Sequence, residues 1–523
     1  MPALGRWFLL LTPVAAGLLY GPLIHRFARE ARGHGVPEVM YAVAETGGRI
    51  RPQVAAVKAL ASAICIGGGG SVGREGPIVQ IGSALGSAVG QVARLPAARM
   101  RILVACGAAG GIAATFNAPL AGVFFALELI LADFAVESFA AVVLSAVAAS
   151  VVGRAILGDH PFLTLPAFTV THPDQFLGFA ALGVAAAGAG VLFSRLLYAI
   201  EDVCDRLWRG PQWLRPAAGG LLLGALLLVL PQMYGVGYPV LGSAAAGAYT
   251  VTFLLVLLLA KILATSLTIG IGGSGGVFAP SLFIGAMLGA ATGQILHIAD
   301  PALAPAPGAY ALVGMGAVFA GAARTPITAV LIMFELTGQY RIILPLMLAI
   351  AVAAGLSRLL SPDTIYTRKL TRRGVDLLSP TRRLRQTSIA VAAGPLPEPI
   401  PPEANVAAVA ARFAAGTADT LPVRDGAGHI VGVITAEDVE QVLAAADVTA
   451  AQLARPVPSL AADADLESAM TQLARHHVGG LPVVTADRPP ITWVTHHDLL
   501  RAAAAIGRPA PHRRPAAATP AEA

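Results

Sequence analysis

One carboxylate stands out in a stretch of the chain that is otherwise almost uncharged. Glu75 lies in the run GGGGSVGREGPIVQIGSALG, which covers residues 67–86. Pro77 suits the first turn of a helix, because the amide proton that proline lacks would have no partner there. The N-terminus of a helix carries about +0.5 of a charge and unpaired N–H groups, which suit an anion. Glu75 is therefore either a helix cap or part of an anion site, and its surroundings decide between the two.

The surroundings of Glu75 indicate an integral membrane domain. Of the 523 residues, 56% are hydrophobic and only 13% are charged, whereas soluble domains carry about 25% charged residues. The deficit is concentrated before residue 362, where the apolar runs are 7–24, 53–66, 77–94, 101–115, 119–132, 135–152, 176–199, 215–230, 250–270, 277–297, 309–323, 326–336 and 342–360. Several runs are shorter than the ~20 residues that span a bilayer. Short, broken segments favour a transporter or channel whose half-helices meet at a central site.

The membrane region contains an internal repeat. Glycine, three residues and proline occur at 73–77 and again at 276–280, which places the two prolines 203 residues apart (280 − 77). Further on, NAPLAGVFFALEL (117–129) matches RTPITAVLIMFEL (324–336), with an offset of 207 residues (326 − 119) between their prolines. In both copies a glutamate follows the proline by nine residues (128 − 119 and 335 − 326). Corresponding interrupted segments in two halves indicate a binding site at their interface.

Charge and cysteine content further narrow the class of membrane protein. The net charge is +6, and the basic clusters at 368–369 and 372–373 directly follow the last apolar run. This is the positive-inside pattern of a membrane protein, so we expect the C-terminal region in the cytoplasm and no nucleic-acid partner. The three cysteines lack metal-ligand spacing, so neither disulfides nor a metal site is expected. The run 7–24 has no cleavage pattern after it and is interpreted as a membrane helix, not a signal peptide.

After residue 388 the chain takes on the character of a soluble α/β domain with its own repeat. LPVRDGAGHIVGVITAEDV (421–439) matches LPVVTADRPPITWVTHHDL (481–499) with a constant offset of 60 (481 − 421). Each copy predicts a strand, a turn, a second strand and a helix, and Thr435 and Thr495 are placed to cap those helices. We therefore expect a membrane domain at 1–366, a connector at 367–388, the repeat domain at 389–505 and a disordered tail at 506–523.

These residues resemble the CLC family of chloride channels and anion/proton antiporters, here with a tandem pair of CBS domains. The resemblance covers nearly the whole chain and rests on four motifs together: GHGVP (33–37), GREGP (73–77), GIGGSGGVFAP (270–280) and the tyrosine of DTIYTRKL. It implies an α-helical polytopic membrane fold of two inverted repeats of broken helices, followed by the α/β CBS domain. It also implies a homodimer in the cell membrane, with one pore per subunit and gating by voltage or pH.

The resemblance also implies the residues of the anion path. Three glycine-to-proline segments can each start a half-helix that points positive charge at one place, where amides and polar side chains replace the water of an anion. By the resemblance, the amides of Val277 and Phe278 and the hydroxyl of Tyr366 line the central site. Glu75 is then a gate whose carboxylate occupies an anion position and leaves when protonated. The expected anion-binding residues are His34, Gly35, Val36, Arg74, Glu75, Gly76, Val277, Phe278 and Tyr366. By its chemistry alone, Tyr366 fits an interfacial anchor equally well.

Two departures from the family pattern leave alternatives open. His34 stands where the family often has serine; a neutral imidazole can donate to an anion and a protonated one binds it more strongly, or else the ring points away. Few residues precede Trp7, where the family has another long helix. Either the start is misassigned, the chain is truncated, or that helix is absent.

A third departure concerns proton coupling. Proton-coupled members commonly carry two adjacent glutamates after the NAPLAG-type segment, and the second is the internal proton acceptor; here the pair is Glu128 and Leu129. Neighbouring helical residues point about 100° apart, so Glu128 is not a simple substitute. Its match to Glu335 suggests that both glutamates are structural. Leucine cannot relay a proton, so passive anion flow is favoured, with a chloride/proton antiporter that uses another proton route as the alternative.

The CBS-like segments raise the question of a nucleotide. Such modules pair and often bind adenine nucleotides, and Thr435, Asp438, Thr495 and Asp498 stand where they often contact a ribose. No Gly-rich phosphate loop marks a site, so the alternative is a unit for dimerisation and folding only. Anion transport itself requires no cofactor.

The sequence as a whole predicts an anion channel or transporter that is gated by Glu75 and carries chloride or a similar anion. A CBS-bearing cation transporter is a distant alternative, because a cation path needs carboxylates or aligned carbonyls and the apolar region holds few acidic residues. An enzyme is not expected, because the apolar region shows nothing resembling a nucleophile–base pair or a metal cluster.

Overall fold

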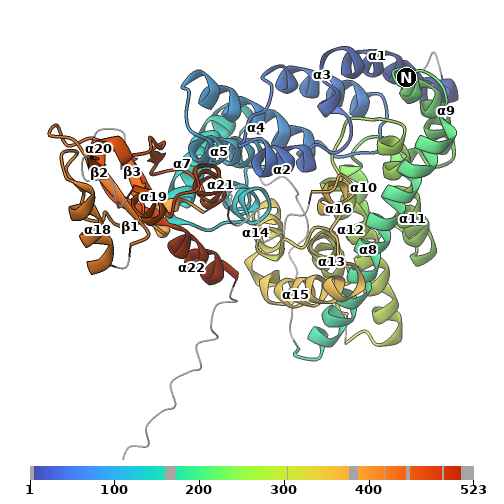
Figure 1. Ribbon diagram of the computed structural model, residues 1–523. Coiled ribbons are helices and arrows are strands. Elements are labelled where there is room, and N and C mark those ends of the chain that lie inside the picture. Colours follow the sequence, from blue (N-terminus) through green and yellow to red (C-terminus); the bar gives the residue numbers. More distant parts are fainter. Residues whose placement is uncertain are drawn as a thin grey trace, which may run out of the picture. The chain divides into compact units, whose positions relative to one another are not determined.

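The computed structural model describes residues 5–158, 172–302, 304–375, 384, 387–416, 418–442, 448–485 and 488–507. The chain divides into two compact units, Met1–Val375 and Asp376–Ala523. The first is built of helices and the second contains both strands and helices (Figure 1). Most of the tail predicted at 506–523, and part of the connector predicted at 367–388, lie outside the described residues.

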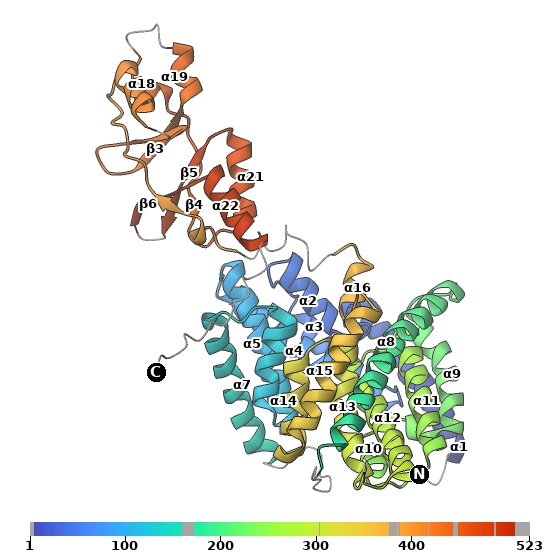
Figure 2. The same ribbon diagram turned by 90° about the horizontal axis from the view of Figure 1, so that it is seen from below.

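The long helices of the first unit follow the apolar runs of the sequence and lie side by side (Figure 2). They are α1 (Gly5–Phe27), α5 (Ala97–Phe116), α7 (Val136–Leu157), α8 (Gln175–Leu207), α11 (Val251–Gly270), α12 (Phe278–Ala299) and α15 (Ile343–Leu360). In the part of the chain that the structure describes, these seven segments are long and apolar enough to cross a bilayer.

Shorter helices and turns connect the long ones. The helices are α2 (Val36–Glu45), α3 (Gln53–Gly67), α4 (Glu75–Val92), α6 (Pro119–Phe125), α9 (Arg215–Val229), α10 (Tyr238–Ala245), α13 (Pro307–Ala323), α14 (Pro326–Thr337) and α16 (Thr367–Thr371). Single turns form η1 (Arg29–Ala31), η3 (Pro231–Met233) and η4 (Tyr340–Ile342), and a π-helix, η2 (Ala126–Leu131), continues α6. α4 and α12 each begin two residues before the proline of their motif. α10 has no counterpart among the apolar runs of the sequence.

The internal repeat of the sequence is also a repeat of packing. α4 packs along α5 as α12 packs along α13, and α5 contacts α7 as α13 contacts α15. A Cβ at Gly82 would lie 2.0 Å from the carbonyl oxygen of Gly107, and one at Gly285 would lie 2.2 Å from that of Gly314. Only glycine permits such close approach of two helix backbones. The repeated glycines therefore mark equivalent helix contacts in the two halves.

Two glutamates at equivalent positions connect the halves. Glu335 in α14 accepts hydrogen bonds from the backbone N–H groups of Leu120 at 2.9 Å and Ala121 at 2.7 Å, in the first turn of α6. Glu128 accepts from the N–H of Thr328 at 2.9 Å and from its hydroxyl at 2.7 Å, in the first turn of α14. Each carboxylate thus caps the helix of the other half, where the helix dipole favours negative charge. The expectation that both glutamates are structural is confirmed.

The second unit contains two copies of one motif. The first copy is β2 (Thr420–Arg424), β3 (Ile430–Thr435) and α19 (Ala436–Val442), and the second is β5 (Gly480–Thr485), β6 (Arg488–Thr495) and α22 (His496–Gly507). The strand pairs are antiparallel in matching register, with Thr420 opposite Thr435 and Gly480 opposite Thr495. The predicted order of strand, turn, strand and helix is confirmed.

Further elements complete this unit. β1 (Gly394–Pro395) and β4 (Leu460–Ala461) extend the second copy to a four-stranded sheet of order β1-β6-β5-β4, whereas β2 and β3 form a separate pair. The helices are α18 (Val406–Ala415), α20 (Ala450–Leu453) and α21 (Leu466–His476), and η5 (Ile389–Val391) is a single turn. Each copy surrounds its own apolar core, one around Val409 and Val423 and the other around Leu473 and Leu481.

Both copies cap their final helix in the same way. The Asp438 N–H donates to the Thr435 hydroxyl at 3.3 Å, and the Asp498 N–H donates to the Thr495 hydroxyl at 3.2 Å. The two hydroxyls donate back to the aspartates at 2.7 and 2.6 Å. The predicted threonine caps are confirmed. The copies differ in one respect: the carboxylate of Asp438 is buried and also pairs with Arg455.

Candidate anion site

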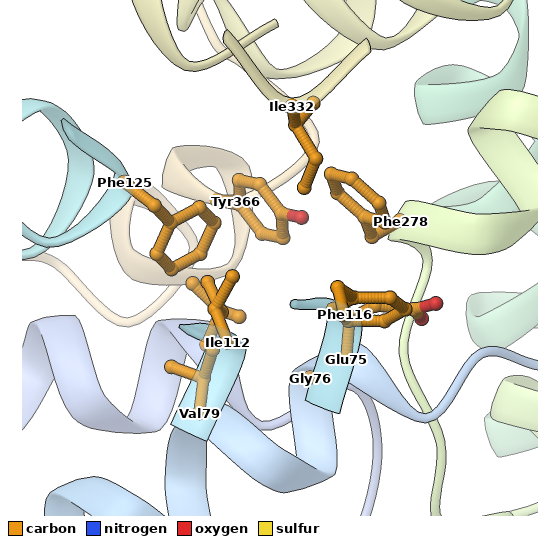
Figure 3. A pocket seen from close by; sticks show the side chains of 10 residues that line it. Glu75, Gly76, Val79, Ile112, Phe116, Phe125, Phe278, Ile332 and Tyr366 are labelled. Atoms are coloured by element: carbon orange, nitrogen blue, oxygen red, sulfur yellow. The ribbon is translucent and has the colours of Figure 1, made fainter. Parts of the chain in front are cut away.

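Segments that lie far apart in the sequence meet at one cavity in the first unit (Figure 3). The N-termini of α2, α4 and α12 line it together with Tyr366, the residue before α16. Backbone hydrogen bonds align the loops before these helices: Gly33 N–H donates to the Gly273 carbonyl at 2.9 Å, and Gly73 N–H donates to the Gly276 carbonyl at 2.8 Å. These bonds bring the positive ends of three helices to one place, which is an arrangement that suits an anion.

One glycine of the first motif is required by this close packing. Gly35 has a φ of 80°, and a Cβ there would lie 2.9 Å from the carbonyl oxygen of Gly76. A side chain would therefore be strained and would push α2 away from α4. Gly35 contributes to the site by letting the two helix N-termini approach each other.

The cavity is narrow and mostly apolar. Its wall consists of Val36, Glu75, Gly76, Val79, Ile112, Phe116, Phe125, Phe278, Ile332 and Tyr366, and its volume is about 10 Å³. Such a volume holds a single water-sized particle. The Tyr366 hydroxyl points into this space toward Phe278 and Ile332 (Figure 3). In a space walled by apolar groups, a hydroxyl and helix N-terminal amides act strongly on an ion, because little water screens them.

The Glu75 carboxylate lies at the N-terminus of α12. Its Oε2 accepts a hydrogen bond from the Ala279 N–H at 3.4 Å, and its Oε1 accepts one from the Tyr238 hydroxyl at 2.8 Å. The residue is buried, with 4% of its surface exposed. Helix N-terminal N–H groups are where an anion binds. The carboxylate therefore lies at the N-terminus of a second helix, α12, where the helix dipole favours negative charge.

The structure brings five of the nine predicted anion-binding residues to the cavity wall: Val36, Glu75, Gly76, Phe278 and Tyr366. His34, Gly35, Arg74 and Val277 adjoin them in the same loops but do not belong to the wall. The guanidinium of Arg74 lies over the Phe116 ring, 5.1 Å from its centroid, and Arg74 lines a separate groove beside α5 and α7. Tyr366 has 1% of its surface exposed, which rules out an exposed interfacial anchor.

The ring of His34 is directed toward α8. Its Nε2 lies 3.3 Å from the Tyr198 hydroxyl oxygen, and that hydroxyl donates to the Ile365 carbonyl at 2.8 Å. The His34 and Tyr366 rings are 6.0 Å apart, centroid to centroid, and His34 has 1% of its surface exposed. His34 therefore adjoins the site residue Tyr366 from behind the cavity wall.

Tyr238 is a partner of Glu75 that the sequence analysis does not predict. It begins α10, a helix of eight residues that is too short to stand out as an apolar run. A signal for it exists, because glycine, any residue, glycine, any residue and proline occur at 33–37 and again at 235–239, with an offset of 202 (235 − 33). Tyr238 thus corresponds to Val36 in the other half. This second copy of the motif predicts a fourth helix N-terminus at the site.

Two buried lysines also escape the sequence analysis. Lys58 Nζ donates to the carbonyls of Ala31 at 2.9 Å and Gly33 at 2.8 Å, in the segment before α2. Lys261 Nζ donates to the Gly235 carbonyl at 3.0 Å, in the segment before α10. Both have 0% of their surface exposed, and they are 203 residues apart (261 − 58). Each lysine therefore holds the equivalent loop of its half, and the offset of the repeat could have identified the pair.

The residues expected to decide proton coupling lie in the π-helix η2. Leu129 is buried, with 7% of its surface exposed. The neighbouring carboxylate of Glu128 is bound to the first turn of α14. Leu129 has no carboxylate, and the carboxylate of Glu128 is already hydrogen-bonded.

In the second unit, the residues expected at a ribose take part in the helix caps described above. The hydroxyls of Thr435 and Thr495 and the carboxylates of Asp438 and Asp498 are hydrogen-bonded to one another within each copy. The nucleotide site stays a prediction.

These features define a multi-pass membrane protein with an anion path framed by broken helices. A family model described as voltage gated chloride channel matches residues 16–358, and a CBS domain model matches residues 397–445 and 446–505. The chain therefore belongs to the voltage gated chloride channel family and carries two CBS domains. The predicted fold class, the CBS pair, the multi-pass membrane location and the anion-transport class are confirmed. The family is one of channels and transporters.

Relatives and solved structures agree with this assignment. The H(+)/Cl(-) exchange transporter ClcA of Vibrio parahaemolyticus is 36% identical over 360 residues, which is 67% of this chain and 76% of that protein. A solved slow cyanobacterial Cl-/H+ antiporter is similar with a TM-score of 0.63 and 28% identity, over 71% of this chain and 88% of its own. The structure of a eukaryotic CLC transporter aligns with 94% of this chain, over 89% of its own length, with a TM-score of 0.59. Because the two sequences are only 23% identical, this similarity supports the fold alone.

Proposed function

We propose that the chain moves chloride or a similar small anion across the cell membrane, with Glu75 as the gate. The observation that carries the proposal is the position of the Glu75 carboxylate on the Ala279 N–H at the start of α12. A carboxylate and a mobile anion cannot occupy this place together. Protonation removes the charge that the helix N-terminus stabilises, so a protonated Glu75 leaves and an anion enters. The relatives named as chloride transporters support chloride as the cargo.

The other site residues hold the anion without trapping it. Backbone amides of α12 and the Tyr366 hydroxyl are neutral donors, so they replace hydration water but let the ion leave. A lysine in the wall would add a full countercharge and slow the passage. Lys58 and Lys261 lie nearby with their ammonium groups bound to backbone carbonyls instead.

Anion flux from liposomes tests the gate. Wild-type protein is expected to release chloride faster as the pH falls, because protonation opens the path. Glu75→Gln mimics the protonated side chain and is expected to conduct at all pH values. Equal flux of wild type and Glu75→Gln at every pH would mean that Glu75 only holds helices together.

Exchange of chloride for protons is the second candidate, favoured by relatives that are named exchange transporters. Against it stand Leu129 and the engaged carboxylate of Glu128. Liposomes with a proton gradient and equal chloride on both sides separate the two. Uphill chloride movement that Glu75→Gln abolishes supports exchange, whereas chloride that only dissipates its own gradient, without stoichiometric proton movement, supports passive flow.

The assembly and the second unit complete the proposal. The chain forms a homodimer with one path per subunit, and the CBS unit lies in the cytoplasm and binds an adenine nucleotide. Titration of the full chain with ATP tests the last point, with Thr435, Asp438, Thr495 and Asp498 as the expected contacts. An absence of binding at millimolar nucleotide would leave the CBS unit a scaffold. Chemical cross-linking in the membrane tests the dimer.

A further inference from the structure

His34 has one unpartnered polar atom in a fully enclosed place. Its Nε2 contacts the Tyr198 hydroxyl oxygen at 3.3 Å. Its Nδ1 is buried and has no hydrogen-bond partner among the described residues. A buried polar atom without a partner is unfavourable, and such atoms in native proteins often mark the place of a ligand or a water. Tyr366, whose hydroxyl lines the anion cavity, adjoins the His34 ring.

Tyr198 determines which nitrogen of His34 carries the proton. A phenol has one proton to donate, and Tyr198 donates it to the Ile365 carbonyl at 2.8 Å. The phenol oxygen can then only accept from His34, so Nε2 carries a proton. Hydrogen positions of this kind follow from the hydrogen-bond network. The opposite tautomer would draw the phenol proton away from the Ile365 carbonyl and leave a buried acceptor unpaired, which is unfavourable.

This tautomer has a consequence for anion binding. A neutral imidazole has one N–H and one nitrogen that carries only a lone pair. When Nε2 of His34 carries the proton, Nδ1 therefore presents its lone pair to any neighbouring group. A lone pair repels a bare anion. An imidazolium donates from both nitrogens and adds a positive charge. His34 therefore attracts a halide only after Nδ1 has also taken up a proton.

The charged groups around His34 link that proton to the anion. Lys58 of α3, Lys369 of α16 and Arg373 act on the ring from different elements. Glu38 of α2 pairs with both Lys369, at 3.2 Å, and Arg373, at 2.7 Å. Burial of the ring, and after it the three cations, oppose a further positive charge on the ring while no anion is bound, and the cations attract an anion. An anion beside Nδ1 offsets their repulsion, so proton and anion bind more favourably together than separately.

We propose that His34 binds the transported anion as an imidazolium: Tyr198 keeps one proton on Nε2, and Nδ1 takes up a second proton as the anion binds. Tyr198 is a positioning residue, since it acts through the ring and does not contact the anion. The proposal rests on the proposed function, because it concerns the same cargo. It assigns to the chain a proton-linked anion site that is separate from Glu75.

Calorimetric titration of the full chain with chloride tests the proposal. The Glu75→Gln background is used, because the gate then takes up no proton. Titrations at pH 6, 7 and 8 in two buffers of different ionisation enthalpy give the number of protons taken up with each chloride. We expect an uptake that approaches one proton, and an affinity that falls by up to about tenfold per pH unit.

Three substitutions in the same background separate the roles. His34→Ser and His34→Asn cannot take up the proton, so chloride binding is expected without proton uptake and with little dependence on pH. Tyr198→Phe frees Nε2, so neutral His34 can present an N–H at Nδ1 and the uptake is expected to fall toward zero while chloride still binds. Tyr234→Phe is the matched control, because Tyr234 also donates to a backbone carbonyl, that of Gly67 at 2.6 Å, and is expected to leave the uptake unchanged.

The outcomes are distinct. Chloride binding without proton uptake in the Glu75→Gln background overturns the proposal. If bicarbonate binds without proton uptake and chloride does not bind, the proposal is also overturned. The ligand would then be one whose O–H donates to the lone pair of Nδ1. Full uptake in Tyr198→Phe overturns the role of Tyr198. If neither wild type nor Glu75→Gln binds or moves chloride, the proposed function itself fails, which these measurements distinguish from a failure at His34 alone.

Discussion

The starts of α4 and α12 use the same five-residue frame with different chemistry. Residues 73–77 read GREGP and residues 276–280 read GVFAP. The first glycines of the two frames are paired backbone to backbone, and the prolines occupy the same place in each helix. Glu75 nevertheless corresponds to Phe278. The first half supplies a carboxylate, and the second half supplies the N–H group of Ala279 that donates to it.

Other pairs of the repeat behave in the opposite way. Lys58 and Lys261 each donate to the carbonyl of the equivalent glycine, Gly33 or Gly235. Glu128 and Glu335 likewise accept hydrogen bonds at equivalent helix starts. Each pair serves to hold loops or cap helices. The residues that these pairs share thus have structural contacts, whereas the proposed gate, Glu75, stands at a position where the two halves differ. His34 also stands at such a position, because Val236 corresponds to it in the second half.

The largest effect is expected where the halves differ most. Glu75→Gln removes the charge from two hydrogen bonds, each of which contributes about 1.5–3 kcal/mol while the group is charged. A neutral hydrogen bond is about half as strong, so the two bonds together lose about 1.5–3 kcal/mol. At 1.4 kcal/mol per factor of ten, chloride flux from liposomes at neutral pH should rise by roughly 10- to 100-fold and lose its dependence on pH. Phe278→Leu at the equivalent position is the control, and it should keep the pH dependence. A pH dependence that persists in Glu75→Gln would place the gate elsewhere.

The next effect concerns a pair that the halves share. Lys261→Met leaves the carbonyls of Gly235 and Val236 without the donor that Lys261 provides, at about 1–3 kcal/mol per unpaired group. Lys58→Met should cost less, because the carbonyls of Ala31 and Gly33 keep the Ser274 hydroxyl and the Gly275 N–H as donors. Both variants should lower the thermal unfolding midpoint in detergent, Lys261→Met by the larger amount, or lower the yield of folded protein if they do not withstand purification. Arg26→Met, on the exposed end of α1, should change little. A larger loss for Lys58→Met than for Lys261→Met would contradict this account of the two lysines.

The extent to which the site could be predicted follows from the range of its contacts. Glycine, proline and the apolar runs act locally, so the helices and the loops of the anion path could be located from the sequence. The partner of Glu75 could not, because Tyr238 is 163 residues away and meets it only through the pairing of the two halves. The direction of the His34 ring depends on Tyr198, 164 residues away. The position of a lysine within an apolar run also does not predict which backbone carbonyls will accept its hydrogen bonds, as those of Ala31 and Gly33 do for Lys58.

A smaller effect is expected for the glutamates that connect the halves. Glu128→Gln and Glu335→Gln keep an oxygen acceptor but lose the charge at a helix N-terminus, which contributes about 0.3–2 kcal/mol. The two losses of unfolding free energy should be similar. They should also add within about 0.5 kcal/mol in the double variant, because the two caps share no atoms.

The control for this pair is Glu137→Gln, an exposed glutamate in the first turn of α7, which should cost less than either. Strong non-additivity in the double variant would show that the two caps form one network, and the halves could then not be treated as separate pieces.

The smallest effect extends the comparison to the two copies of the second unit. Asp425 follows β2, and Thr485 takes its place in the second copy, 60 residues later (485 − 425). Asp425 accepts hydrogen bonds from the N–H groups of His429 at 2.8 Å and Ala427 at 3.0 Å. The His429 N–H above all lowers the pKa of the Asp425 carboxyl below its ordinary value. The turn of the first copy therefore carries a charge-dependent contact.

The sign of the pH effect follows from that lowered pKa. A carboxyl whose pKa is lower in the folded state than in the unfolded state stabilises the fold above its ordinary pKa, and this contribution is lost as the pH falls through the folded value. Hydrogen exchange, corrected for the intrinsic rate, should show the Ala427 and His429 amides losing protection at acid pH. Asp425→Asn keeps an oxygen acceptor without a titrating group, so its protection should not change with pH. The effect is confined to an exposed turn, so the global unfolding midpoint should hardly move. An equal loss of protection in Asp425→Asn would assign the acid sensitivity to another group.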